Sequence, residues 1–431
     1  MRRHRISCAI AAAIWLAGCT APFDVAPSAD NEAAYSALYP LYAELCAVSQ
    51  IKKKPGFGVD TSGGPGGHAV FYLNRVCRDR DAGYPTLVMC GAGVPADEQG
   101  VGLSVNAHFQ NANWVATDGR DFFFDGDLQP GAPLTRAAYA ETQKTAEAKG
   151  IYDGIVFHPE VFADMPPGMD RHDFMYEVSA ATDYAVAFGR DRYCARVPVT
   201  PGQMKKMVDY LNQVNDIYRD GKKEFVWNVV QNNCSHLAHN ALAAAGVWDD
   251  WPTDRFIAIS AFDFPVPKNE FVNLMRRTND MDVADPRSLY RDDAARQSLV
   301  EDAELPTEPG ALAEAVPMVQ DNAIYDTSVN LIFYDDPITA RYSRRFHQIF
   351  SAPRYTDLRA NLDYFAALYG NIRSNQAKLP PAAMRAPDDF HRFLALYKAY
   401  IDHEARSVDA QLETLNRLPS LAASTVGGIR P

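Results

Sequence analysis

The start of the sequence constrains the fold most, because it indicates the compartment in which the rest of the chain acquires its structure. A basic stretch, Met1 to Arg5, precedes a largely apolar run of twelve residues from Ile6 to Ala17. Such a run is too short to cross the roughly 30 Å apolar core of a bilayer, and it is typical of a secretory signal. We therefore expect residues 1–18 to be a signal peptide and the remaining chain to fold in an oxidising compartment.

The apolar run ends in the residues Leu-Ala-Gly-Cys at Leu16 to Cys19, which resemble a lipobox, the cleavage signal of bacterial lipoproteins. The resemblance implies that Cys19 becomes a diacylated N-terminus and that residues 19–33 form a lipidated tether. Thr20 stands where an aspartate would retain the protein at the inner membrane, so the implied location is the periplasmic face of the outer membrane. The alternative is a plain secretory signal followed by a chance cysteine.

Five cysteines remain after Cys19, and an odd number in an oxidising compartment leaves one thiol unpaired. If Cys234 is the free one, the other four form two disulfides in one of three pairings, and the sequence does not choose among them. These disulfide candidates are Cys46, Cys77, Cys90 and Cys194.

Composition and charge exclude several classes of protein. Hydrophobic residues make up 47 % of the chain and charged residues 22 %, which excludes a largely disordered chain, a fibre and a polytopic membrane protein. The net charge of −12 becomes −15 when residues 1–18 and their three arginines are removed, so a nucleic-acid partner is not expected. The longest basic run, Lys52 to Lys54, is interpreted as a solvated loop.

The length of 431 residues exceeds a single core, so we expect several units. Residues 34–264 are predicted to form an α+β domain, residues 265–320 an irregular, acidic, proline-punctuated connector with little core, and residues 321–420 a helical domain. The helices of that last domain are expected at Ile338–Phe350, Thr356–Ala377 and Pro387–Leu418.

Within the mixed domain, apolar periodicity predicts a helix over Glu32–Gln50, and Met175–Phe188 is a further candidate helix. A capping box of Thr200 and Gln203 predicts the start of another helix, and a third is expected from Asn232 to Gly246. Strands are expected at His68–Val76, Gly102–Phe109, Trp114–Ala116, Phe122–Phe124, Ile155–Phe157 and Tyr193–Val199.

Two of these elements carry residues whose chemistry is complementary. His68 opens a strand after a glycine-rich loop, and Cys234 follows two asparagines at a helix start. A helix N-terminus lowers a thiol pKa, and an imidazole takes the thiol proton and later returns it to a leaving group. Because Cys234 lies on the apolar face of its helix, packing on the sheet is expected to bring it against the start of the His68 strand. The alternative is a compact core cysteine.

The sequence Gly-His-Ala at Gly67 to Ala69, followed far along the chain by Asn-Cys-Ser-His at Asn233 to His236, resembles the permuted NlpC-type branch of the papain-like fold. That branch includes lecithin-retinol acyltransferase, and in it the histidine precedes the cysteine. The similarity covers about Tyr35 to Trp251. It implies an α+β fold with an antiparallel sheet and helices, with Cys234 as nucleophile and His68 as general base.

The same resemblance implies a third polar residue on the next strand, which orients the imidazole. Ser104, Asn106 and His108 share one face of the predicted Gly102–Phe109 strand, and His108 or Asn106 is the candidate. The alternative for this face is simple solvation. The backbone N–H of Cys234 is a candidate donor to an oxyanion.

The expected activity is that of a cysteine-dependent hydrolase or acyltransferase, which cleaves an amide or ester through a thioester and needs no cofactor. Peptidoglycan stem peptides and the acyl chains of nearby lipids are the two substrate classes, and the resemblance slightly favours acyl substrates. The lipid bilayer is a further partner, through the N-terminal anchor. The alternative is a non-catalytic papain-like scaffold or binding module of the outer membrane.

Other groups of polar residues in the sequence predict no further functional site. Cys234, His236 and His239 lie on one helix, which does not easily direct all three at one metal ion, and no metal is expected. The acids between Asp121 and Asp127 lack a complete calcium loop, so a strand ending in a turn is expected there. Spacing selects no acid pair among Glu98, Asp153, Asp173 and Asp183.

Overall fold

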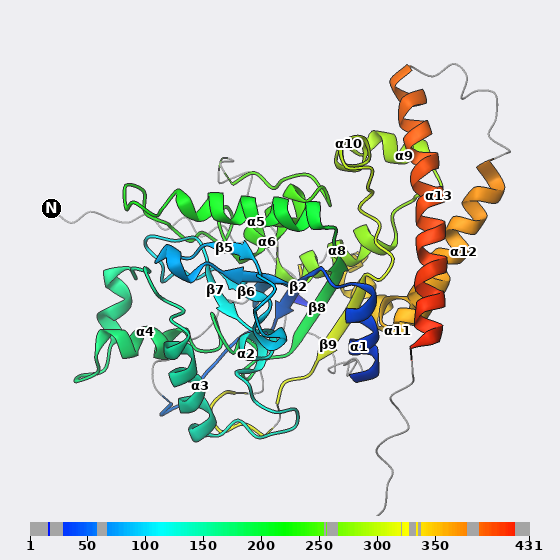
Figure 1. Cartoon of the computed structure of the whole chain (residues 1–431). Coiled ribbons are helices and arrows are strands. Elements are labelled where there is room, and N and C mark those ends of the chain that lie inside the picture. The colour runs from blue at the N-terminus through cyan, green and yellow to red at the C-terminus, as the bar shows by residue number, and fades with distance from the viewer. Residues whose placement is uncertain are drawn as a thin grey trace, which may run out of the picture.

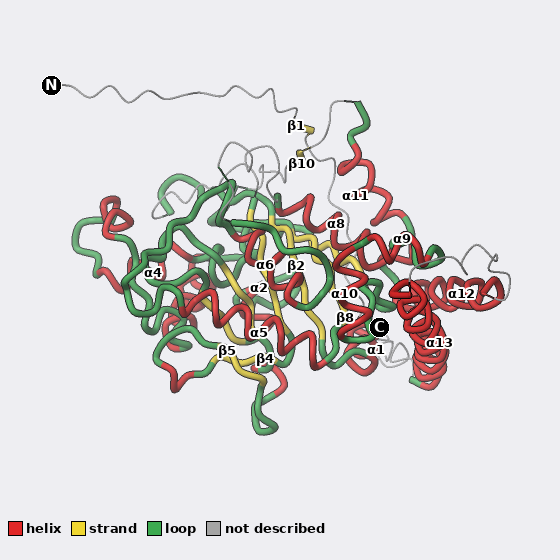
Figure 2. The backbone as a smooth tube through the Cα atoms, turned by 90° about the horizontal axis from the view of Figure 1, so that it is seen from above, coloured by secondary structure: helices red, strands yellow, loops and turns green. Residues whose placement is uncertain are grey.

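The structure is a computed structural model of the chain. It describes residues 16–17, 29–57, 67–253, 256, 266–319, 321–326, 333–334, 338–376 and 388–418. Apart from Leu16 and Ala17, the expected signal peptide lies outside the described residues, and so do Cys19 and the tether up to residue 28. The described chain has mixed α+β architecture around an antiparallel sheet (Figures 1 and 2).

The main sheet has six strands in the order β7-β6-β3-β2-β8-β9, and all of its neighbouring pairs are antiparallel. The strands are β2 (Tyr42–Val48), β3 (His68–Leu73), β6 (Val101–Ser104), β7 (Val115–Asp118), β8 (Arg192–Pro198) and β9 (Leu312–Val316). Val48 at the end of β2 is directly opposite His68 on one side and Arg192 on the other. The start of β3 and the start of β8 therefore lie at the same end of the sheet.

Two short ribbons accompany this sheet. The strand β4 (Val76–Arg78) pairs with β5 (Leu87–Met89), and β1 (Leu16–Ala17) pairs with β10 (Phe333–Tyr334).

The main sheet separates two apolar cores, because side chains alternate along its strands. Ala43, Leu45 and Ala47 of β2 belong to one core, and Tyr42 and Cys46 belong to the other. The first core is covered by α5 (Pro201–Asp216), α6 (Cys234–Ala244) and α8 (Pro267–Asn279). The second is covered by α1 (Ala29–Leu38), α12 (Leu358–Gln376) and α13 (Asp388–Arg417).

Figures 1 and 2 show α12 and α13 together at one end of the molecule, remote from α4 (Arg171–Ser179). The remaining helices are α2 (Arg120–Asp125), α3 (Arg136–Ala148), α9 (Pro286–Arg291), α10 (Asp293–Glu301) and α11 (Arg341–Ser351). Short 3₁₀ turns cover Arg80–Ala82, Ala96–Glu98, Pro159–Asp164 and Pro353–Tyr355. Among the helices in the described ranges, none combines the length and the apolar composition needed to cross a bilayer.

The capping box predicted at the start of α5 is confirmed. The Thr200 hydroxyl accepts the Gln203 backbone N–H at 3.2 Å, and the Gln203 side-chain carbonyl accepts the Thr200 N–H at 2.8 Å. Pro201 occupies the first helical position, where its missing N–H costs no hydrogen bond. The predicted helix from Asn232 to Gly246 and the three C-terminal helices also match α6, α11, α12 and α13 within a few residues.

The prediction of one helix over Glu32–Gln50 is wrong in its second half. The helix α1 ends at Leu38, and Pro40 is followed by β2, the strand between β3 and β8. All residues of β2 are buried, because both of its faces meet a core. A strand buried on both faces carries no polar alternation, so the apolar spacing of this segment resembled that of a helix.

The predicted connector over residues 265–320 is also wrong as an irregular segment. It contains α8, α9 and α10, and β9 completes one edge of the main sheet. Phe122–Phe124, predicted as a strand, lies in α2, and Ile155–Phe157 contributes an isolated bridge between Phe109 and Phe157. β9 and the bridge depend on partners far along the chain, which local patterns do not reveal. The helices form through local hydrogen bonds, which the acidic, proline-punctuated composition did not suggest.

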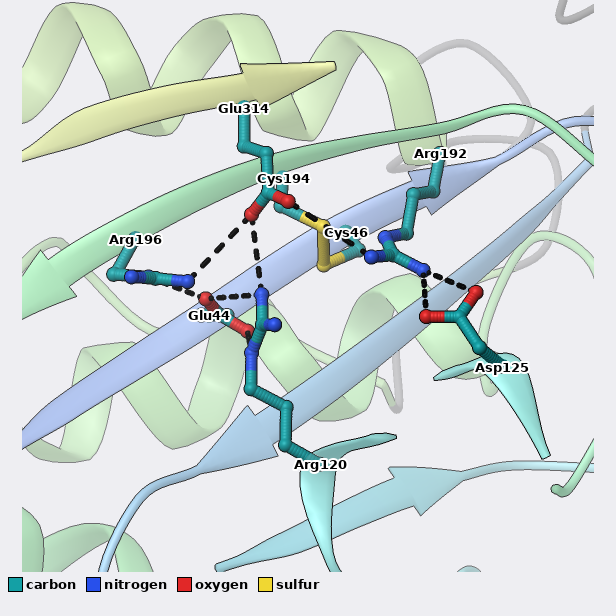
Figure 3. Close-up of a disulfide and its surroundings, with 8 residues drawn as sticks. All are labelled: Glu44, Cys46, Arg120, Asp125, Arg192, Cys194, Arg196 and Glu314. Carbon is teal, nitrogen blue, oxygen red and sulfur yellow. Dashed lines mark hydrogen bonds and ion pairs between the residues drawn. A yellow bond between two sulfur atoms is a disulfide. The ribbon is translucent and has the colours of Figure 1, made fainter. Parts of the chain in front are cut away.

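A cluster of charges covers one face of the sheet around a disulfide (Figure 3). Glu44 of β2 is fully buried and is paired with Arg120 and Arg196, and Glu314 of β9 contacts the same two guanidinium groups. The cluster joins β2, β8, β9 and α2 through ion pairs, on the side of the sheet opposite α6.

Candidate functional site

Cys234 is the free cysteine among the described residues, and the other four are joined in pairs. The prediction of two disulfides with Cys234 left over is confirmed. One bridge links Cys46 to Cys194, which stand directly opposite each other on β2 and β8. The second bridge links Cys77 to Cys90 across the β4–β5 ribbon.

The free thiol stands at the first residue of α6. Asn233 caps this helix, and its side-chain oxygen accepts the backbone N–H groups of Ser235 at 2.9 Å and His236 at 3.2 Å. The sulfur of Cys234 accepts the backbone N–H of Ala69 at 3.3 Å. The helix therefore presents its thiol to the start of β3, one residue beyond His68.

His68 contacts Ser104 on the neighbouring strand. Its Nε2 atom lies 2.8 Å from the Ser104 hydroxyl oxygen, which in turn lies 2.8 Å from the Thr182 carbonyl and 3.0 Å from Asp183 Oδ1. Because the hydroxyl donates its one proton to the carbonyl or the carboxylate, its oxygen accepts a hydrogen bond from Nε2–H of His68. This tautomer leaves Nδ1 of His68 as an acceptor.

The thiol and the imidazole are near each other but are not hydrogen-bonded in the described structure. The contact with Ala69 places the sulfur within about 6 Å of the His68 Cα atom, since covalent geometry fixes the remaining distance. Strand alternation places His68 on the face of Val70, while α6 packs on the face of Ala69. His68 is the first residue of β3, so it stands at the end of the strand where the Cys234 sulfur contacts Ala69.

Asp183 is the hub of the polar groups behind His68. Its carboxylate accepts hydrogen bonds from Ser104, from the side-chain amide of Asn106 at 3.1 Å and from the hydroxyl of Tyr152 at 3.1 Å. Burial raises its pKa to about 6, against the lowering effect of these donors. The sequence alone did not single out Asp183, because its partners Ser104 and Asn106 lie more than 70 positions earlier in the chain.

The two residues predicted as third members hydrogen-bond to described residues other than His68. Asn106 reaches Asp183 instead, and Nδ1 of His108 lies 3.4 Å from the hydroxyl of Ser179. Both follow the end of β6 at Ser104, because the strand is shorter than the predicted Gly102–Phe109. Ser104, which shares their predicted face, is the residue that meets the imidazole.

The thiol and the imidazole are both neutral in this environment. Burial raises the pKa of Cys234, although hydrogen bonds from Ala69, Ser235 and its own N–H and the charge of Arg190 oppose this effect. Burial, with a contribution from Arg190, lowers the pKa of His68 to about 3. The expectation of a thiol pKa lowered by the helix start is therefore not met, because burial has the larger effect.

Arg190 is a further charged group at this place, and sequence reasoning missed it. It is 2 % exposed, and its Nε and Nη1 atoms donate to the carbonyls of Ser49 at 2.6 Å and Ala181 at 2.8 Å. No motif marks it, since both partners are backbone groups of distant segments.

The histidines of α6 are separate from the thiol. His239 Nδ1 lies 2.7 Å from Glu270 Oε2, and its ring stacks on Trp248 at 4.2 Å. His236 is buried, and neither of its ring nitrogens has a hydrogen-bond partner among the described residues. Within the described ranges, no three His, Cys, Asp or Glu side chains converge closely enough to hold a metal ion.

The remaining acids noted in the sequence stand apart from this site. Glu98, Asp153 and Asp173 are exposed, and Asp125 forms an ion pair with Arg192. Comparisons of the chain with protein-family models, with curated proteins and with solved structures give no match.

Proposed function

We propose that this protein is an envelope lipoprotein whose papain-like, permuted NlpC-type domain acts as a cysteine-dependent hydrolase or acyltransferase. The observation that carries the proposal is the position of Cys234. This unpaired thiol stands at the start of a capped helix, and its sulfur accepts a hydrogen bond from the backbone N–H of Ala69, the residue after His68. A nucleophile beside a base that is itself oriented by a third group is the arrangement used in covalent catalysis.

In the proposed reaction, His68 keeps Nε2 on Ser104 and presents Nδ1 to the thiol. Catalytic hydrogen bonds are often long in a free enzyme and shorten when substrate binds, which is the step required here. The sulfur attacks the carbonyl carbon of an amide or ester as its proton moves to Nδ1. The carboxylate of Asp183, behind Ser104, stabilises the imidazolium that forms.

The tetrahedral intermediate carries its negative charge on the former carbonyl oxygen. The backbone N–H of Cys234 donates to this oxygen at the helix start. The leaving amine or alcohol takes the proton from His68 as its bond to carbon breaks, which leaves a thioester on Cys234. Water or a second acceptor then cleaves the thioester, giving its proton to His68 and restoring the thiol.

The proposed location in the envelope favours two substrate classes, stem peptides of peptidoglycan and acyl chains of membrane lipids. The test is acyl capture by the non-reduced full chain, incubated separately with a synthetic stem peptide and with a short-chain p-nitrophenyl ester. Intact-mass analysis is expected to find an adduct on the wild type that hydroxylamine removes and that Cys234→Ser does not form. If neither substrate gives an adduct on the wild type, the proposal is contradicted.

The second candidate is a non-catalytic scaffold with the same fold. The observation that favours it is the buried, neutral thiol, which is not hydrogen-bonded to His68 in the described structure. In a scaffold, Cys234 only fills space at the helix start, so Cys234→Ala leaves every property but packing unchanged.

A further inference from the structure

Arg190 is a buried cation that has no acidic partner among the described residues. The buried arginines of the strand β8, which begins two residues later, are matched, since Arg192 pairs with Asp125, and Arg196 pairs with Glu44. The guanidinium of Arg190 contacts two backbone carbonyls, and no Asp or Glu in the described ranges forms an ion pair with it. A buried charge without a counter-charge is costly, so its retention needs a reason.

The position of Arg190 relates it to the thiol and the imidazole. One of its partners, the Ser49 carbonyl, follows directly after Val48, which is the residue opposite His68 in the sheet. The other, the Ala181 carbonyl, precedes Thr182, whose own carbonyl accepts from the Ser104 hydroxyl. The guanidinium is therefore tied to both segments that surround the imidazole.

The ionisable groups that interact with Arg190 are few. Tyr325 and Cys234 both act on it, and Arg190 acts in turn on Cys234 and His68. Burial keeps the pKa of Tyr325 above its ordinary value, so its hydroxyl stays neutral. His68 supplies no negative charge, and Asp183 is engaged by Ser104, Asn106 and Tyr152. Burial lowers the pKa of Arg190 to about 10, so the guanidinium remains charged at neutral pH.

We propose that Arg190 is the counter-charge for the Cys234 thiolate, and that its positive charge also favours an anionic group at the sulfur. When the thiol proton moves to Nδ1 of His68, the electron pair stays on sulfur, and Arg190 stabilises the resulting negative charge. This inference deepens the proposed function and rests on it, since it gives Cys234 a reactive thiolate. Arg190 acts on the reaction by stabilising the charge of the Cys234 sulfur, so it is a positioning residue and not a catalytic one.

The test compares alkylation of Cys234 in the full, non-reduced chain by neutral iodoacetamide and by anionic iodoacetate. In Arg190→Met and Arg190→Gln, the pH midpoint of alkylation is expected to rise by about 1 to 2 pH units, because a close opposite charge has been removed. The ratio of the iodoacetate rate to the iodoacetamide rate is expected to fall roughly threefold or more. Arg190→Lys, which keeps the charge, is expected to restore most of both properties.

Arg192→Met is the matched control, because it removes a buried arginine two residues along the chain that pairs with Asp125 and Glu314. It is expected to leave the midpoint and the ratio unchanged. Circular dichroism and elution volume report whether each variant folds. If both uncharged variants fail to fold, the ratio of the iodoacetate rate to the iodoacetamide rate in the wild type is compared with the same ratio for N-acetylcysteine: a higher ratio in the protein supports the proposal, and an equal or lower ratio overturns it. Equal midpoints and equal ratios in Arg190→Met, Arg190→Gln and the wild type would overturn the proposal.

The outcomes separate this inference from the proposed function. Arg190-dependent alkylation together with no acyl adduct on Cys234 would remove the enzymatic proposal and leave the charge pair. An acyl adduct that forms equally well in the Arg190 variants, with unchanged alkylation, would remove the charge pair and leave the enzyme.

Discussion

Replacing Glu44 by glutamine removes the central negative charge of the cluster in Figure 3. The Glu44 side chain is fully buried, and its oxygens accept hydrogen bonds from Arg120 at 3.1 Å and from Arg196 at 2.5 Å. The substitution leaves two mostly buried guanidinium groups with less counter-charge. Breaking a buried pair in this way costs about 3 to 5 kcal/mol of unfolding free energy. Urea denaturation followed by circular dichroism at neutral pH measures this loss.

The pH dependence of the same variant tests the charge argument separately. Burial alone would raise the pKa of Glu44, but Arg120 and Arg196 lower it well below its ordinary value. A carboxyl whose pKa is lower in the folded state stabilises the protein above its unfolded pKa of about 4.3, and this contribution is lost as the pH falls through the folded pKa. The difference between wild type and Glu44→Gln is therefore expected to shrink below about pH 4.

Asp125→Asn is the matched control for this prediction, because Asp125 pairs with Arg192 but its side chain is 37 % exposed. Its expected cost is below about 1 kcal/mol, since solvent screens a partly exposed pair. A loss below about 1 kcal/mol for Glu44→Gln as well, or a loss that is independent of pH, would refute the pairing described for this cluster.

Two further predictions concern the disulfides and Ser104. Replacing both cysteines of the Cys46–Cys194 bridge by serine is expected to cost about 5 kcal/mol, against about 3 kcal/mol for the Cys77–Cys90 bridge, because the first closes a loop of 148 residues and the second a loop of 13. Equal losses in non-reducing urea titrations would contradict this order. Ser104→Ala is expected to slow acylation of Cys234 by about tenfold with little change in the urea midpoint, since it removes the partner of His68 Nε2. An unchanged rate would show that the hydroxyl does not orient the imidazole.

The features that the sequence predicted well are those controlled by neighbouring residues. The capping box at Thr200, the cap at Asn233 and the three C-terminal helices all rest on contacts within a few positions. The free Cys234 followed from an odd cysteine count, although the pairing of the others required the register of β2 with β8.

The features that were missed depend on distant partners. The strand β2 was read as helix, because the strands that pair with it and most of the residues that bury its two faces come from later in the chain. Ser104 and Asp183 lie 79 positions apart, and Arg190 reaches Ser49 across 141 positions. Neither contact leaves a periodic signal in the sequence. The raised pKa of Cys234 was missed for the same reason, since burial arises from packing and not from the helix start.

The central claim is that His68 is the base that activates Cys234. The most direct measurement is the rate at which iodoacetamide alkylates Cys234 across the range of about pH 5 to 9, in the non-reduced wild type and in His68→Ala, with His108→Ala as the control. We predict that loss of His68 slows alkylation about tenfold or more near neutral pH, while loss of His108 leaves it unchanged. Equal rates in the wild type and His68→Ala would contradict the claim and identify Cys234 as a core cysteine.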